Sequence, residues 1–222
     1  MCKGNEIVCK NSVKYLGAVL DQDLSGKSMG QSAIKKINKG LKFMYRKADF
    51  LDFKCRKMLC QSLLQSHFDY SCNVWYRNLN KLLKTRLQCA QNKIIRYIMN
   101  YDNRHHLVCN DFVKLGFLDV AQRVDYLSVN LMFEIFHKTA PQYLCNVELI
   151  NHGHRTRNSS LSFVVPHVKT QGSKSFLYNG IKLWNSLPSY VKVIDEKAAF
   201  KLKCKQYFFK KMTDEELSDY TV

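Results

Sequence analysis

Two carboxylates separated by one residue, Asp21 and Asp23, follow an apolar segment that could be a β-strand. Paired carboxylates at the end of a strand can hold Mg²⁺ for phosphoryl transfer. A polymerase-type site needs a third carboxylate on a neighbouring strand, and Glu6 is the only acid before Asp21. We therefore expect the pair to shape a turn, because aspartate side chains readily accept hydrogen bonds from nearby backbone amides.

Other patterns that carry chemistry are weak. His152 and His154 flank one glycine with Cys145 upstream, but a zinc site would need a fourth ligand. The nine cysteines include no CxxC spacing, which fits reduced intracellular thiols better than a disulfide framework. A cysteine–histidine nucleophile pair could still meet in the fold. We expect no cofactor, no resident metal and no small-molecule substrate.

The chain carries a large excess of positive charge, with 35 Lys and Arg residues against 18 Asp and Glu and a formal net charge of +17. Such an excess usually marks a polyanionic partner, most often nucleic acid. Residues 149 to 194 contain neither Asp nor Glu, which suits the neutralisation of phosphates. A solvated basic surface without a specific partner is the competing interpretation.

The spacing of apolar residues predicts a mainly α-helical protein. A first helix begins near Ser28, with Ser28 or Ser32 as its cap, and its buried side repeats in steps of three and four. Residues 55–76, 79–100, 112–117, 121–137 and 195–211 are predicted to form further helices. We expect Trp75 and Trp184 to pack in the core.

Strands are predicted only in short ribbons. Glu6–Cys9 and Val13–Leu20 are rich in β-branched and aromatic residues and would pair around a turn at 10–12. Ser162–Val165 and Ser175–Tyr178 could form a second ribbon near residues 160–180.

The predicted organisation is a β ribbon over residues 1–22, a helical region over 23–140 and a basic region with the last helix over 141–222. No apolar run of about 18 residues occurs, so we expect no membrane span. The start of the chain lacks the apolar core of a signal peptide, and an intracellular protein of the nucleus or cytoplasm is expected.

Several segments occur in the order seen in one family. Val13–Asp21 resembles the Tyr-Leu-Gly-Val-x-Leu-Asp strand pair that follows the palm of non-LTR retrotransposon reverse transcriptases of the jockey and Rex kind. Ser32–Gly40 is similar to their first thumb helix. Ser62–Tyr70 followed by Trp75 resembles the next helix, although His67 stands where the family often has proline. Similar matches are Leu87–Arg96, Arg155–Arg157 and Leu183–Pro188.

The resemblance implies the helical thumb-like bundle of an RNA-directed DNA polymerase from a transposable element. In that family the catalytic aspartates lie in an Ala-Asp-Asp motif before the Tyr-Leu-Gly segment, and this sequence contains no such motif. We therefore expect a truncated reverse transcriptase fragment that is not an enzyme on its own. A helical protein-interaction module and a non-functional decayed reading frame are the alternatives.

A thumb grips primer–template RNA or DNA by its sugar-phosphate backbone, largely without reading bases. The first thumb-like helix and the later motifs supply the candidate residues. The predicted nucleic-acid-binding residues are Lys35, Lys36, Lys39, Lys42, Arg46, Lys47, Lys93, Arg96, Arg155 and Arg157.

Overall fold

The computed structural model describes residues 10–149, 161–169 and 172–219, with side chains described up to Asp214. The chain forms two compact units, Met1–Asn100 (unit 1) and Tyr101–Val222 (unit 2). The divisions predicted after residues 22 and 140 do not coincide with this boundary. The predicted strand Glu6–Cys9, the histidines at 152 and 154, and the arginines at 155 and 157 lie outside the described residues.

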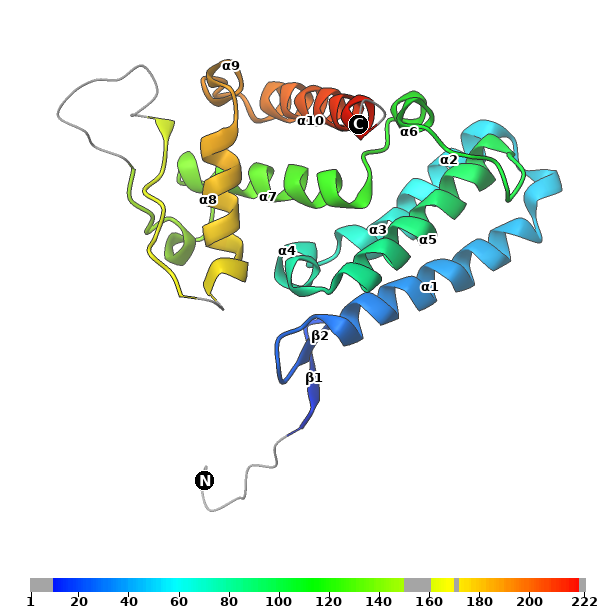
Figure 1. The fold of residues 1–222 in the computed structure, drawn as a ribbon, viewed down its shortest axis with the longest axis horizontal. Helices are drawn as coiled ribbons and strands as arrows, with labels where there is room; N and C mark the ends of the chain where they lie inside the picture. Colours follow the sequence, from blue (N-terminus) through cyan, green and yellow to red (C-terminus); the bar gives the residue numbers. More distant parts are fainter. Residues whose placement is uncertain (1–9, 150–160, 170–171, 220–222) are drawn as a thin grey trace. The chain divides into compact units, whose positions relative to one another are not determined.

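Both units are mainly helical, and the part of the chain that the structure describes contains one small antiparallel sheet near the N-terminus (Figure 1). The predicted fold class, a mainly helical protein with a small N-terminal ribbon, is confirmed. No described helix has both the length and the apolar composition needed to cross a membrane.

The N-terminal ribbon is a tight hairpin of β1 (Ser12–Tyr15) and β2 (Ala18–Asp21). The prediction of one strand over Val13–Leu20 was wrong, because Leu16 and Gly17 turn the chain back on itself with φ values of 45° and 87°. Two successive residues with positive φ match the strand twist of a hairpin. The Tyr70 hydroxyl donates a hydrogen bond to the Leu16 carbonyl and holds this turn.

The first helix, α1 (Lys27–Tyr45), begins at Gly26 with φ 69° and has no serine side-chain cap. Asp21 at the end of β2 takes that role. Its carboxylate accepts hydrogen bonds from the Ser28 backbone N–H at 3.1 Å and from the Ser25 hydroxyl at 3.3 Å. The predicted cap at Ser28 or Ser32 is therefore corrected to a carboxylate from the preceding strand, which joins the hairpin to α1.

The predicted helix over residues 55–76 is interrupted. The elements are α2 (Phe53–Leu59), the π-helical turn η2 (Cys60–Leu64), α3 (Gln65–Asp69), α4 (Cys72–Trp75) and the 3₁₀ turn η3 (Tyr76–Asn78). Ser71 breaks the run with φ 51°. The Trp75 indole is buried and donates to the Tyr70 carbonyl at 2.9 Å, which confirms its predicted core position.

The longest helices of unit 1, α1 and α5 (Lys81–Met99), pack side by side and run parallel (Figure 1). Gly30 near the start of α1 approaches Leu79, just before α5, and a Cβ on Gly30 would lie 3.1 Å from the Leu79 Cδ2. At the other end, the Tyr97 hydroxyl donates to the Met44 carbonyl at 3.2 Å. The predicted buried stripe of α5 is confirmed at Leu83, Leu87, Ala90, Ile94 and Ile98.

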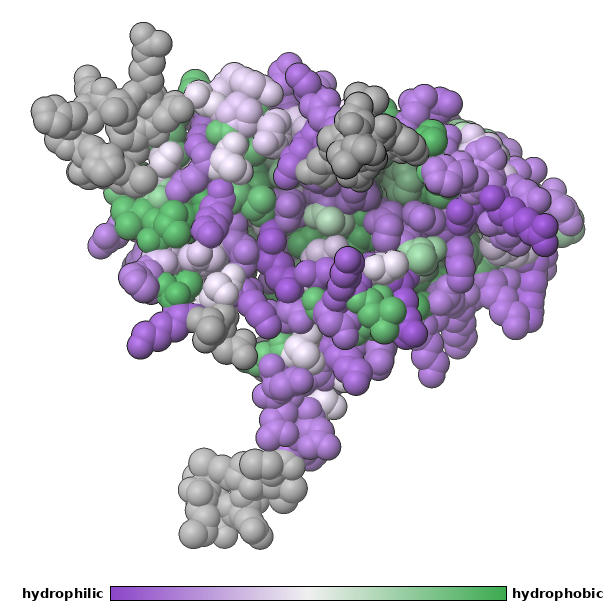
Figure 2. All heavy atoms as spheres, in the orientation of Figure 1, coloured by the Kyte–Doolittle hydropathy of each residue, from purple (hydrophilic) through white to green (hydrophobic). Residues whose placement is uncertain are grey.

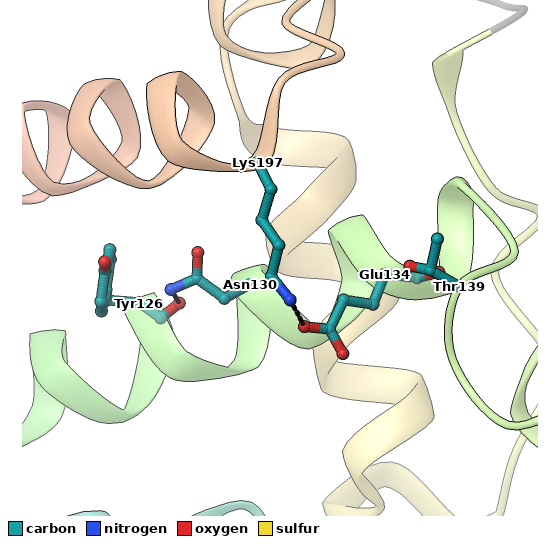
Figure 3. Close-up of polar contacts among 5 residues, drawn as sticks. All are labelled: Tyr126, Asn130, Glu134, Thr139 and Lys197. Atoms are coloured by element: carbon teal, nitrogen blue, oxygen red, sulfur yellow. Dashed lines mark hydrogen bonds and ion pairs between the residues drawn. The ribbon is translucent and has the colours of Figure 1, made fainter.

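Unit 2 contains the helices α6 (Cys109–Leu115), α7 (Val120–Phe136), α8 (Phe176–Ser186), α9 (Ser189–Lys192) and α10 (Lys197–Asp219). Its 3₁₀ turns are η4 (Gln142–Leu144) and η6 (Gly172–Lys174), and unit 1 has the 3₁₀ turn η1 (Ala48–Phe50) after α1. Trp184 of α8 is fully buried, as predicted, and stacks on Phe136 of α7 with ring centroids 5.2 Å apart. Lys197 at the start of α10 pairs with Glu134 of α7 at 2.7 Å (Figure 3).

The second ribbon predicted near residues 160–180 is not formed by the described residues. Ser175 instead caps α8, because its hydroxyl accepts from the Tyr178 N–H at 3.3 Å. Phe163 makes one isolated bridge to Leu149. On its other side the Asn185 side chain accepts from the Phe163 N–H at 3.0 Å and donates to its carbonyl at 2.8 Å, in place of a partner strand.

Candidate nucleic-acid interface

The solvent side of α1 carries a continuous row of cations. The buried residues of the helix include Ala33, Ile37 and Leu41, which share one side. At 3.6 residues per turn the opposite side carries one exposed cation per turn from residue 35 onward. These are Lys35, Lys39, Lys42 and Arg46.

A second, flanking row on α1 mixes charge with an aromatic ring. Lys36 and Phe43 are exposed and lie on one flank of the row described above. Lys47, also exposed, follows in the turn after the helix. All six predicted cations are exposed, but only Lys35, Lys36, Lys39 and Lys42 belong to α1, since Arg46 is its C-cap residue and Lys47 lies in the turn that follows. In Figure 2 the surface over α1 is mostly hydrophilic. We call the exposed side chains of residues 35–47 the basic face.

No acid lies within the basic face itself, and the nearest one along the chain is Asp49 in η1 (Ala48–Phe50). The 19 residues of α1 include no Asp or Glu, and neither do the 19 residues of α5 beside it. No ion pair joins the six cations to any residue that the structure describes. A helix face of this kind offers its full charge to a polyanion, because no internal salt bridge has to break first.

The remaining described candidates lie on α5. Lys93 is exposed, and Arg96 is half-buried one turn later. Arg96 lies near Tyr45 at the end of α1: burial raises the pKa of the Tyr45 phenol, and the positive charge of Arg96 acts in the opposite direction. Arg96 thus adjoins the basic face, and no contact places Lys93 there.

A hollow of about 310 Å³ lies where the hairpin meets α1 and α3, and it is lined by Lys14, Lys36, His67 and Tyr70 among others. Burial lowers the pKa of His67, and the nearby charge of Lys36 lowers it further. Both effects favour the neutral imidazole of His67. The two lysines of the hollow, with no acid in its lining, suit an anion.

Some basic residues serve the fold. The Arg56 guanidinium donates to the carbonyls of Ala48 and Leu51 and to the Asn100 side chain, each at 2.9 Å. Lys192, within the acid-free segment 149–194, is buried and donates to the Asn185 carbonyl at 2.9 Å, and burial lowers its pKa. That segment therefore offers fewer cations to phosphates than its composition suggested.

Asp21 and Asp23 shape the turn, as predicted. Asp21 caps α1, and the Asp23 carboxylate accepts from the Ser25 N–H at 3.0 Å, a bond that lowers the Asp23 pKa. Among the described residues, no group of three or more His, Cys, Asp or Glu side chains could hold a metal ion.

Sequence reasoning missed Lys14, which lines the hollow, and the exposed rings of Phe43 and Phe50. Phe43 could have been found, because it lies off the apolar stripe of its helix and one turn from two lysines. Lys14 could not, since its approach to α1 depends on the hairpin turn.

Comparisons with protein-family models, with curated proteins and with solved structures found no match to this chain.

Proposed function

We propose that unit 1 binds RNA or DNA through the phosphate backbone, without sequence preference, using the basic face of α1. One observation carries the proposal: four exposed cations lie on a 19-residue helix that contains no acid, and two more, Arg46 and Lys47, are exposed directly after it. Lys and Arg contacts to phosphates release condensed counterions, which is the main source of non-specific affinity.

We further propose that the chain is the post-palm region of a non-LTR retrotransposon reverse transcriptase, acting inside the cell. The ordered set of motifs supports this, as does the arrangement of a Tyr-Leu-Gly hairpin followed directly by a basic helix. In such a polymerase the basic face would contact the phosphates of the primer–template, which comprises a duplex and an unpaired stretch of template. Polymerase activity is proposed for the whole enzyme and not for this chain by itself.

The test compares two charge-reversal variants with equal net charge. Lys35→Glu/Lys39→Glu/Lys42→Glu removes three cations of the basic face. The control Lys201→Glu/Lys203→Glu/Lys210→Glu reverses three exposed cations of α10. Binding to a fluorescein-labelled oligonucleotide of mixed sequence is followed by anisotropy between 0.05 and 0.3 M salt, with helicity checked by circular dichroism.

We expect the α1 variant to bind at least about 100-fold more weakly at 0.1 M salt, since three phosphate contacts contribute about two powers of ten there. Its salt dependence should also flatten by about two in the log–log slope, from about 0.7 per contact on a single strand. The α10 control should lose much less. Equal losses in the two variants would show that net charge alone drives binding, and no binding by the unaltered chain would refute the proposal.

A further inference from the structure

Four aromatic side chains between residues 43 and 53 are exposed to solvent. The exposed fractions are 64% for Phe43, 44% for Tyr45, 84% for Phe50 and 53% for Phe53. Phe50 is the most exposed large apolar side chain in the described part of the chain. Single exposed apolar residues are ordinary, but a gathering of them within a few turns marks a binding surface.

Three of these rings make no ring contact within the fold. Tyr45 packs edge-on against Tyr97 with centroids 4.9 Å apart, so it belongs to the contact between α1 and α5. Phe43, Phe50 and Phe53, by contrast, make no ring contact with any aromatic residue that the structure describes, and Phe43 and Phe50 are the most exposed of the three. Their faces are open to a ligand.

The open rings lie within the basic face and directly after it. Phe43 is four residues from Lys39 within α1, so this cation lies about one helical turn from the ring, and Lys47 follows in the turn after the helix. Phe50 belongs to the 3₁₀ turn η1, which begins directly after Lys47. A partner that fits must therefore combine negative charge at intervals with flat apolar surfaces.

We propose that Phe43 and Phe50 are stacking platforms for nucleobases, so that the nucleic acid bound by α1 is single-stranded. The inference rests on the proposed function and adds the class of ligand. In a duplex the faces of the bases are covered by their neighbours, whereas a single strand can place a base on each ring while its phosphates meet the lysines. An apolar protein partner would use the rings but leave the lysines on either side of Phe43 without a role.

The experiment removes the ring and the bases separately. One ligand is a labelled single-stranded 12-mer with bases, and the second is the same phosphodiester backbone with abasic residues. The third is the 12-mer annealed to its complement. Each is titrated with the unaltered chain, with Phe43→Ala, with Phe50→Ala and with the control Tyr190→Ala, which removes an aromatic side chain that is 63% exposed in unit 2.

We expect Phe43→Ala and Phe50→Ala each to weaken binding of the base-bearing single strand by about 5- to 150-fold, the range for loss of one stacked base. Binding of the abasic strand and of the duplex should change less than about twofold. Phe43→Trp should retain affinity. The fluorescence of its indole should be quenched by the base-bearing single strand and by neither of the other ligands. The native Trp75 and Trp184 are buried, so the quenching reports the new indole.

Equal binding of the base-bearing and abasic strands by the unaltered chain would overturn the inference. So would an equal loss for all three ligands in Phe43→Ala and Phe50→Ala. Either result leaves the proposed function intact, provided that reversal of Lys35, Lys39 and Lys42 still weakens binding. Failure of all three ligands to bind overturns both proposals and would favour a protein partner for this surface.

Discussion

The close approach of Gly40 of α1 to Leu64 of η2 predicts the direction in which the substitution Gly40→Ala changes the stability of unit 1. A Cβ on Gly40 would lie 2.6 Å from the Leu64 Cδ2, about 1 Å inside the usual carbon–carbon separation. Leu64 is 1% exposed, so its side chain has little room to move away. Gly40 thus allows α1 to lie directly against the π-helical turn, which fixes the position of the basic face.

Two effects oppose each other in Gly40→Ala. Replacing glycine within a helix gains about 1 kcal/mol of stability, whereas forcing a methyl group into a packed contact costs about 1–3 kcal/mol. We therefore expect Gly40→Ala to destabilise unit 1, by up to about 2 kcal/mol. In the Leu64→Ala background, which itself costs about 2–5 kcal/mol, the obstacle is gone and Gly40→Ala should stabilise by about 1 kcal/mol.

The assay must separate the two units, since one unfolding free energy is not defined for a chain whose units unfold independently. The sequence has two tryptophans, Trp75 in unit 1 and Trp184 in unit 2. Labelling with 5-fluorotryptophan gives one ¹⁹F signal for each, and urea titrations of the Trp75 signal report unit 1. The control Asn38→Ala, on the exposed side of α1, should only stabilise. An equal gain from Gly40→Ala in both backgrounds would refute the steric argument.

Two further predictions concern titratable groups. The folded chain lowers the pKa of His67 below its unfolded value, so the contribution of His67 to stability is present above about pH 6.5 and is lost as pH falls through the folded pKa. Lys36→Met should raise the His67 pKa, which an NMR titration measures. An unchanged pKa would contradict the arrangement of the hollow. Burial raises the pKa of Cys60 and of Cys204 to about 12, so at pH 8 their thiolate fractions are on the order of 10⁻⁴. The exposed Cys89 should therefore react with a thiol reagent at least about a thousandfold faster than either buried cysteine. Equal rates in the native protein, read by mass spectrometry of the modified peptides, would show that the two buried sites open readily.

Long helices with one clear stripe were predictable from the sequence. In α5 each turn places a buried apolar residue on the same side, and the Asn80 side chain caps its start by accepting from the Leu83 N–H at 2.9 Å. The basic row of α1 was predictable for the same reason, since a residue off the stripe of an amphipathic helix must face solvent. Local spacing was sufficient for both.

Tertiary contacts decided the elements that the sequence did not predict. The hairpin turn places Leu16 in a conformation that non-glycine residues rarely adopt, and the Tyr70 hydroxyl, 54 positions along the chain, bonds its carbonyl. Phe163 finds its backbone partners on the Asn185 side chain, not on a second strand. The hollow with Lys14 and His67 follows from the turn, so it was also beyond sequence reasoning.

The acid-free side of α1 makes ionic strength act in opposite directions on the free and the bound chain. Lys39 lies three or four residues from Lys35, Lys36 and Lys42, and Arg46 lies four from Lys42. Like charges at this spacing destabilise a helix by about 0.2–0.5 kcal/mol a pair, so the four pairs together cost about 1–2 kcal/mol at low salt. Added salt screens this repulsion and should raise the melting temperature of unit 1, while the same salt weakens its hold on a polyanion. Thermal stabilisation by a short oligophosphate at low salt would then come partly from the relief of self-repulsion within α1.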